Sequence, residues 1–201
     1  MHQDVAPSPD DDRAASRVPG APPRLGEPPL APLERVALEV ERHAASGGWG
    51  ALPRVFALVR TAQALAADPA LAGRLPADVV ADARADPGHL TSVEQEELPE
   101  AADLEELLGR LAWPPAVAGA AVVVERSVLP PSTTLPADPR EALALLTSSP
   151  DREEVRLAVA VLREGGTGTA VRRREDDDDL RVVVDEDLAP GLAAALRATL
   201  G

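Results

Sequence analysis

The segment DREEVRLAVAVLREGGTGTAVRRRE, residues 151–175, contains two runs of alternating residues separated by the glycine-rich sequence GGTG. In the first run an apolar side chain recurs at every second position, at Val155, Leu157, Val159 and Val161. A two-residue period that is interrupted by glycines is typical of two antiparallel strands joined by a tight turn. We therefore predict a β-hairpin with strands over 154–164 and 168–175.

Two further apolar runs predict strands that can join this hairpin. Residues 54–59 contain VFALV, which is apolar throughout and suits a strand buried on both faces. The same residues also fit a helical period, and a helix that begins here is the alternative. We favour a strand followed by a helix that is capped near Thr61 and ends before Pro69. The second run is 119–128, and the short segment 182–184 could extend the sheet.

Helical periodicity marks the segments between these strands. An amphipathic stripe begins at Leu33 and predicts a helix to about Ala45. A second, leucine-striped helix follows Asp103, because Asp103 and the residue three positions later form a capping-box pair. Asp138 precedes a proline and should cap a third helix. This third helix spans 139–147, and the remaining predicted helical segments are ADVVADARA at 77–85 and 188–200.

Together these elements predict an α+β fold. We expect a mostly antiparallel sheet of about four strands, with helices packed on one side. Residues 31–201 should form this single domain, whereas residues 1–30 are rich in proline and aspartate and are expected to be a disordered tail. The predicted strands are 54–59, 119–128, 154–164 and 168–175.

The composition excludes several classes of function. The chain contains no Cys, which removes disulfides, thiolate nucleophiles and Cys-ligated metal sites. Its formal net charge of −14 repels phosphate backbones and anionic membranes, so we expect neither nucleic acid nor a membrane as a partner. The N-terminus lacks the basic and apolar regions of a secretory signal, and the longest apolar run, 116–124, is too short to span a bilayer. A cytoplasmic protein is expected.

Several segments, taken in order, resemble a family of small acidic actinobacterial proteins whose function is uncharacterised. The segments are GGWGALPRVFALVRTAQALA, LTSVEQEELP, LAWPPAVAGAAVVVER, DREEVRLAVAVLREG and LAPGLAAALRATL. The resemblance covers about residues 33 to 200 and implies one cytoplasmic domain. It transfers no catalytic residue, and this chain departs from the family pattern mainly in its proline-rich head and its RRREDDDD block.

Two charged segments are candidates for chemistry. In the acidic segment 89–106, Glu94, Glu96 or Glu97 together with His89 would supply the site of a metal-assisted hydrolase if these side chains met in one cleft. We favour helix caps and a solvated face for this segment. Likewise, the three arginines of 172–174 and the four aspartates of 176–179 favour surface ion pairing and a solvated loop over a phosphate clamp or a cation site.

The sequence contains no G-x-S-x-G, H-E-x-x-H or phosphate-loop motif, so we assign no catalytic residue, metal ligand or cofactor. We expect a non-catalytic protein-interaction or regulatory module, with a hydrolase or a chaperone-like adaptor as alternatives. Trp49 lies between glycines and is the candidate contact for a protein partner, although packing of its ring is the favoured interpretation. Trp113 should be buried beneath the leucine-striped helix. The oligomeric state is not predicted.

Overall fold

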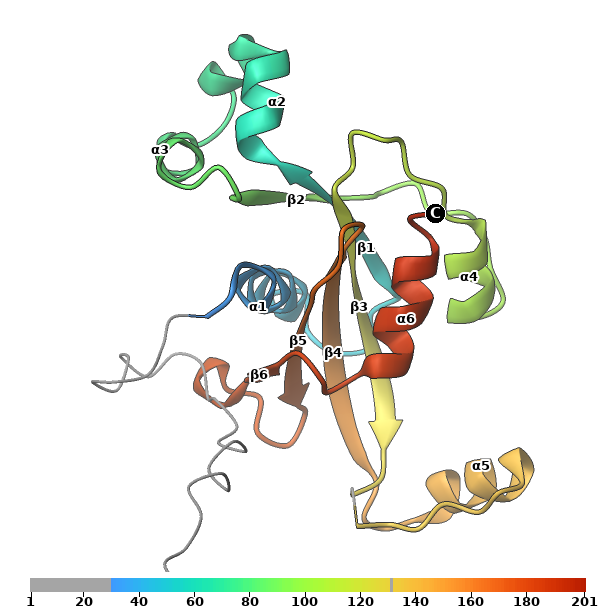
Figure 1. Ribbon diagram of the computed structural model, residues 1–201. Coiled ribbons are helices and arrows are strands. Elements are labelled where there is room, and N and C mark those ends of the chain that lie inside the picture. The colour runs from blue at the N-terminus through green and yellow to red at the C-terminus, as the bar shows by residue number, and fades with distance from the viewer. Residues whose placement is uncertain (1–29, 131) are drawn as a thin grey trace, which may run out of the picture.

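The computed structural model describes residues 30–130 and 132–201, which form an α+β domain around one antiparallel sheet (Figure 1). The predicted disordered tail at 1–30 lies, except for Leu30, outside the described residues. The strand order is β2-β1-β3-β4-β5-β6, so β2 and β6 are the two edges. The strands are β1 Arg54–Arg60, β2 Leu90–Glu94, β3 Gly119–Val128, β4 Glu153–Leu162, β5 Thr167–Arg173 and β6 Val183–Asp185.

The predicted hairpin is confirmed as β4 and β5, which pair antiparallel in the centre of the sheet. Its turn requires glycine, because Gly165 and Gly166 have φ values of 113° and 90°, which side chains strongly disfavour. The register places Arg156 of β4 between Glu125 of β3 and Arg172 of β5. Three charged residues therefore lie side by side across the middle of the sheet.

The helices also begin where the sequence predicts them. Asp103 accepts a hydrogen bond from the Glu106 backbone N–H at 2.8 Å, as its predicted role as a cap requires. The Glu106 side chain accepts from the Ala102 N–H at 2.7 Å and not from the N–H of Asp103, so the second half of the predicted capping box is displaced by one residue. Asp138 likewise accepts from the Arg140 N–H at 2.7 Å. The helices are α1 Pro32–Ala45, α2 Thr61–Ala67, α3 Ala77–Ala85, α4 Leu104–Arg110, α5 Pro139–Ser148 and α6 Pro190–Ala198, with 3₁₀ turns η1 Pro69–Gly73 and η2 Asp179–Arg181.

Thr61 differs from its predicted role as a cap. It is the first residue of α2, and its hydroxyl forms hydrogen bonds with His89 Nδ1 at 2.8 Å and with Thr91 Oγ1 at 2.7 Å. Thr61 is buried, so these two partners satisfy a hydroxyl that has lost its contact with water. The residue therefore ties the beginning of α2 to β2.

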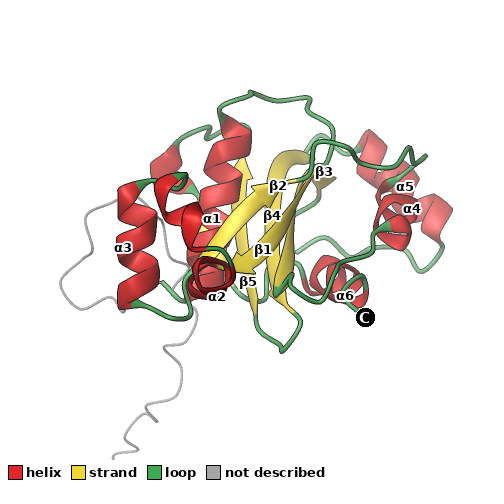
Figure 2. Ribbon diagram, turned by 90° about the horizontal axis from the view of Figure 1, so that it is seen from above, coloured by secondary structure: helices red, strands yellow, loops and turns green. Residues whose placement is uncertain are grey.

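The predictions of about four strands and of helices on one side of the sheet are corrected by the structure. The sheet has six strands, and Figure 2 shows it between α1 on one side and α4 and α6 on the other. Phe56 and Leu58 belong to the core under α1, whereas Val55 belongs to the core under α4 and α6. The continuous apolar run of β1 thus reflects burial on both faces.

One helix does not cover the sheet. α5 stands away from the rest of the domain beyond the ends of β3 and β4 (Figure 1), and none of its residues is buried. Leu143 of this helix is 63% exposed. Among the described residues, no helix has both the length and the apolar character needed to cross a membrane.

Candidate functional site

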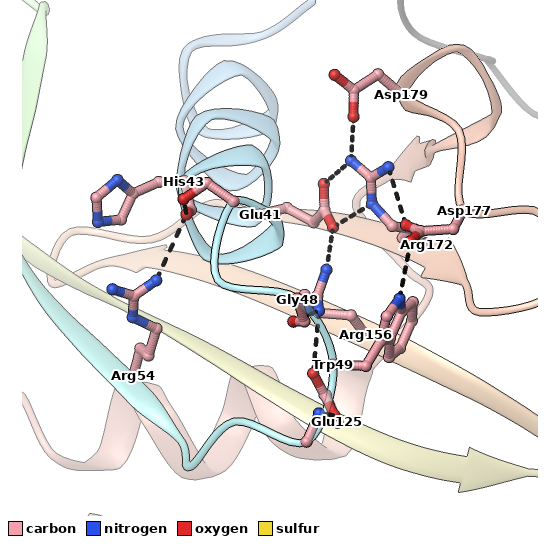
Figure 3. Close-up of polar contacts among 12 residues, drawn as sticks. Glu41, His43, Gly48, Trp49, Arg54, Glu125, Arg156, Arg172, Asp177 and Asp179 are labelled. Atoms are coloured by element: carbon pink, nitrogen blue, oxygen red, sulfur yellow. Dashed lines mark hydrogen bonds and ion pairs between the residues drawn. The ribbon is translucent and has the colours of Figure 1, made fainter.

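A carboxylate and two guanidinium groups are buried together between α1 and the sheet (Figure 3). Glu41 of α1 is 0% exposed, Arg156 of β4 is 1% exposed and Arg172 of β5 is 2% exposed. Arg172 binds Glu41 through two parallel hydrogen bonds, Nε to Oε1 at 2.6 Å and Nη2 to Oε2 at 2.8 Å. Arg156 Nη1 lies 3.5 Å from Glu41 Oε1, close enough for an ion pair but without a hydrogen bond. Glu41 thus forms ion pairs with both arginines.

The second positive charge of this cluster is balanced from outside the core. Asp179 accepts a hydrogen bond from Arg172 Nη2 at 2.5 Å, and Asp177 Oδ1 lies 3.5 Å from Arg172 Nη1. Glu125 accepts from Arg156 Nη2 at 3.0 Å. The hydrogen bond to Glu41 is the main cause that raises the pKa of Arg172 above its ordinary value, against the opposing effect of burial. The guanidinium is therefore permanently charged.

Trp49 covers the outer side of the cluster. Its ring lies 4.3 Å from the Arg156 guanidinium carbon and 5.7 Å from that of Arg174, and its Nε1 donates to Asp177 at 3.1 Å. The ring packs on Arg156 of β4 and on Arg174, which follows β5, so the favoured interpretation of a packed ring agrees with the structure. Its assignment as a partner contact stays a prediction.

The same cluster holds the loop between α1 and β1. Arg156 Nη2 donates to the Gly48 carbonyl, and the Gly50 backbone N–H donates to Glu125 Oε2 at 2.7 Å. With the stacked Trp49 between these two glycines, the loop is fixed at three successive residues. The network therefore holds residues 48–50, in the middle of this loop, against the sheet.

The predictions for the charged block at 172–179 are partly right. Arg173 pairs with Glu153 at 3.3 Å and Arg174 pairs with Glu154, both at the surface, as surface ion pairing requires. Arg172 is buried instead, because the sheet is covered on both faces and its side chain points toward α1. Glu41 and Arg156 escaped the sequence interpretation. The signal for Glu41 in the sequence was a charged residue on an apolar stripe, since Glu41 follows the buried Ala37 by four residues.

The side chains that the alternative interpretation, a metal-assisted hydrolase, requires from the acidic segment 89–106 do not lie in one cleft. His89 precedes β2 and bonds Thr61, whereas Glu94 ends β2 and accepts hydrogen bonds from His43 Nε2 at 2.9 Å and Arg54 Nε at 2.6 Å. Glu94 and Glu96 line one hollow and His89 lines another. Within residues 30–130 and 132–201, no three His, Asp or Glu side chains are grouped so that they could hold a metal ion.

The electrostatics of Glu94 follow from its two partners. Partial burial by itself would raise the pKa of this carboxyl group, but the hydrogen bonds from His43 and Arg54 outweigh it and hold the pKa below the ordinary value of 4.5. Glu94 is therefore ionised at neutral pH and joins the end of β2 to α1 and to the beginning of β1.

A hollow of about 1330 Å³, here called the α4 groove, opens beside these residues. It lies between the end of α1, the loop before β1, the segment after β2 and α4. Leu52, which is 86% exposed, forms part of one wall, and Leu98 and Leu104 form part of the other. A second hollow of about 600 Å³ lies between α4 and α6 and shares Leu104 and Arg126 with the groove. The other apolar lining residues of the groove are Ala44, Ala51, Pro53, Pro99, Ala101, Ala102 and Leu107.

The α4 groove has an acidic rim. Four carboxylates and two guanidinium groups line it, which gives a formal excess of negative charge. Asp103 is engaged as the cap of α4, and Glu94 is engaged by His43 and Arg54. The side chains of Glu96 and Glu100 have neither a hydrogen bond nor an ion pair to any described residue. The charged lining residues are Arg54, Glu94, Glu96, Glu100, Asp103 and Arg126.

Comparison with known proteins places the chain in one family. Residues 33–201 match the family described as PPA1309-like protein. No curated protein and no solved structure matches the chain. The match begins at the second residue of α1 and ends with the last residue of the chain, so it includes every strand, the buried ionic network and the α4 groove. The chain belongs to the family of PPA1309-like proteins.

Proposed function

We propose that this is a non-catalytic protein-interaction module in the cytoplasm of an actinobacterium, and that it binds a segment of a partner protein in the α4 groove. The observation that carries the proposal is the exposure of apolar side chains in a concave surface, above all Leu52 at 86%. Exposed apolar surface that is gathered in a groove and rimmed by polar groups marks interaction sites. A partner segment that covered Leu52 would remove its apolar side chain from water, and this burial would contribute favourably to the free energy of binding.

The size of the groove favours a macromolecular ligand. Small-molecule sites usually occupy about 300–1,000 Å³ and enclose most of the ligand. The α4 groove has about 1330 Å³ and continues past Leu104 into the hollow between α4 and α6. Two adjoining depressions that share Leu104 suit a helix or peptide that contributes several side chains.

The buried ionic network supports the same function. It fixes Gly48, Trp49 and Gly50, and the same loop carries Leu52 into the wall of the groove. A binding surface held in place before the partner arrives loses less conformational entropy on binding. On this proposal Trp49 contributes by positioning the loop.

The test compares two exposed leucines. The full chain is tagged at its native level, and co-purifying proteins are quantified for wild type, Leu52→Asp and Leu143→Asp. Leu143 is the matched control because it is 63% exposed on α5, outside the groove. We expect a stoichiometric partner with wild type and Leu143→Asp, and its loss with Leu52→Asp.

The interaction is then repeated with the purified partner, so that indirect capture is excluded. Trp49→Ala should weaken the interaction less than Leu52→Asp, because it loosens the loop without placing a charge in the groove. A partner that binds Leu52→Asp as tightly as wild type would show that the groove is not the binding surface.

A further inference from the structure

We infer that the partner segment recognised by the α4 groove is a basic amphipathic helix. This inference rests on the proposed function, because it specifies the ligand of the same groove. It is carried by two unpaired carboxylates, Glu96 and Glu100, on the rim of an apolar depression. Charge complementarity at the rim with apolar contact at the centre is the usual arrangement of a protein interface.

The unpaired carboxylates decide the sign of the partner's charge. Any segment that fills the groove removes water from Glu96 and Glu100, and within the described residues neither side chain has a partner to replace that water. Partial desolvation of an unpaired charge is costly, whereas a cationic side chain placed opposite it recovers the loss. A neutral segment would leave both carboxylates uncompensated, and an acidic segment would add repulsion.

The opposing positive charges do not balance the two carboxylates, because one of the two guanidinium groups is already neutralised and only Arg126 has no ion pair to a described residue. Arg54 is neutralised by Glu94, to which its Nε donates at 2.6 Å. Arg126 is the remaining guanidinium of the lining, and its Nη1 donates to the Glu125 carbonyl at 3.1 Å. The formal net charge of −14 adds a long-range field that attracts cations and repels acidic chains.

The lining favours a helix over an added strand. The apolar walls come from the side chains of α4, the end of α1, the loop before β1 and the segment after β2, whereas the edge strand β2 contributes only its last residue, Glu94. β-Strand addition depends on a free strand edge, whereas a helix lays an apolar stripe into a groove through side chains at i, i+3, i+4 and i+7. The occupant is therefore an amphipathic helix with basic residues beside its apolar stripe.

Two occupants from this protein itself fit the charge less well. Residues 1–29 contain three arginines against five acidic residues, so this segment is itself acidic. A second copy of the chain would bring a second formal charge of −14 to the same rim. Both would meet Glu96 and Glu100 with net repulsion, and both can be examined directly.

The experiment measures binding of three labelled synthetic helical peptides to the full chain by fluorescence anisotropy. The peptides share one leucine pattern, and their polar faces carry Lys, Gln or Glu. We expect the Lys peptide to bind about tenfold more tightly than the Gln peptide and the Glu peptide to bind most weakly. Leu52→Asp should abolish binding of all three.

A pair of matched double variants tests the rim. Glu96→Gln with Glu100→Gln should weaken the Lys peptide about fivefold and leave the Gln peptide unchanged, because each partly exposed charge pair contributes modestly. Glu141→Gln with Glu186→Gln removes the same charge from exposed positions outside the groove and should change neither peptide appreciably.

The remaining outcomes separate this inference from the proposed function. Equal binding of the Lys and Gln peptides, lost in Leu52→Asp, would overturn the basic ligand and leave the groove as an interaction site. Lys-peptide binding that survives Leu52→Asp would reveal diffuse attraction and overturn the inference, as would no binding of any peptide. If a peptide of residues 1–29 bound the groove most tightly, or if Leu52→Asp dissociated a dimer, the occupant would be this protein itself.

Discussion

The two faces of the sheet are held by different forces. The face under α1 buries Glu41, Arg156 and Arg172 beside its apolar core, whereas the core under α4 and α6 contains no buried charged residue within the described part of the chain. Hydrogen bonds between charged groups are directional, so they fix α1, β4, β5 and the loop between α1 and β1 in one arrangement. Apolar packing is non-directional and leaves the two hollows beside α4. The face under α1 therefore fixes the position of the surrounding elements, whereas the face under α4 and α6 leaves apolar surface exposed.

The largest expected effect comes from breaking the ionic face. Glu41→Ala leaves two buried guanidinium groups without their shared carboxylate, so we expect the free energy of unfolding to fall by about 3–5 kcal/mol. Urea denaturation at pH 7 measures it. Glu39→Ala is the control, because Glu39 lies exposed on the same helix and should change stability by less than about 1 kcal/mol. Equal losses in the two variants would contradict the distinction between the faces.

The contrast between the faces explains which features the sequence could predict. Local periodicity and capping residues fixed the β4–β5 hairpin, β3 and the beginning of α4, because their signals lie within a few residues of each other. The strand β2 was missed, since LTSVE is a short edge strand in which polar residues outnumber apolar ones. Edge strands pair on one side only and lack the continuous apolar run of a central strand.

The candidate site was less predictable than the fold. Glu41 and Arg172 are 131 residues apart in sequence, and only the tertiary structure brings them together. A charged residue on an apolar stripe indicates that a partner of opposite charge is buried beside it, but the sequence does not show which residue that partner is. The α4 groove depends on how the loop before β1 and the segment after β2 pack around α4. No periodic pattern in the sequence predicts that packing. The carboxylates of 94–106 were assigned to caps and a solvated face, and this holds for Asp103 and Glu106.

The second prediction compares a glycine that is in tight contact with α1 and a glycine of α4 that has free space around it. At Gly168 of β5, an added Cβ would lie 2.3 Å from the backbone of Leu33 in α1, so Gly168→Ala must displace the helix and should cost about 1–3 kcal/mol. Gly109 of α4 has open space around it, and Gly109→Ala should stabilise by about 0.5–1 kcal/mol through helix propensity. Thermal unfolding followed by circular dichroism gives both signs. A neutral Gly168→Ala would mean that α1 is not tightly seated.

A third, smaller effect concerns the acidic loop on the ionic face. Asp179→Asn removes one charge from Arg172 while leaving Glu41 in place, so we expect a loss of about 0.5–1 kcal/mol, reduced because Asp179 is exposed. Amide hydrogen exchange should increase in residues 176–181 before it increases in β5. Asp187→Asn, an exposed substitution after β6, serves as the control. Unchanged exchange in the loop would show that Asp179 does not hold it.

The smallest effect lies where the ionic face meets the α4 groove, at Glu94. Its pKa is lowered in the folded protein, so its ionised form stabilises the fold above the ordinary value of 4.5, and this contribution disappears as the pH falls through the folded pKa. Glu94→Gln should therefore cost about 0.5–1 kcal/mol at pH 7 and progressively less in acid. Urea titrations of both proteins at pH 7 and at pH 3 measure the difference. A difference that persists undiminished at pH 3 would assign the loss to packing in the groove wall, and Glu94 would then belong to the apolar face in energetic terms.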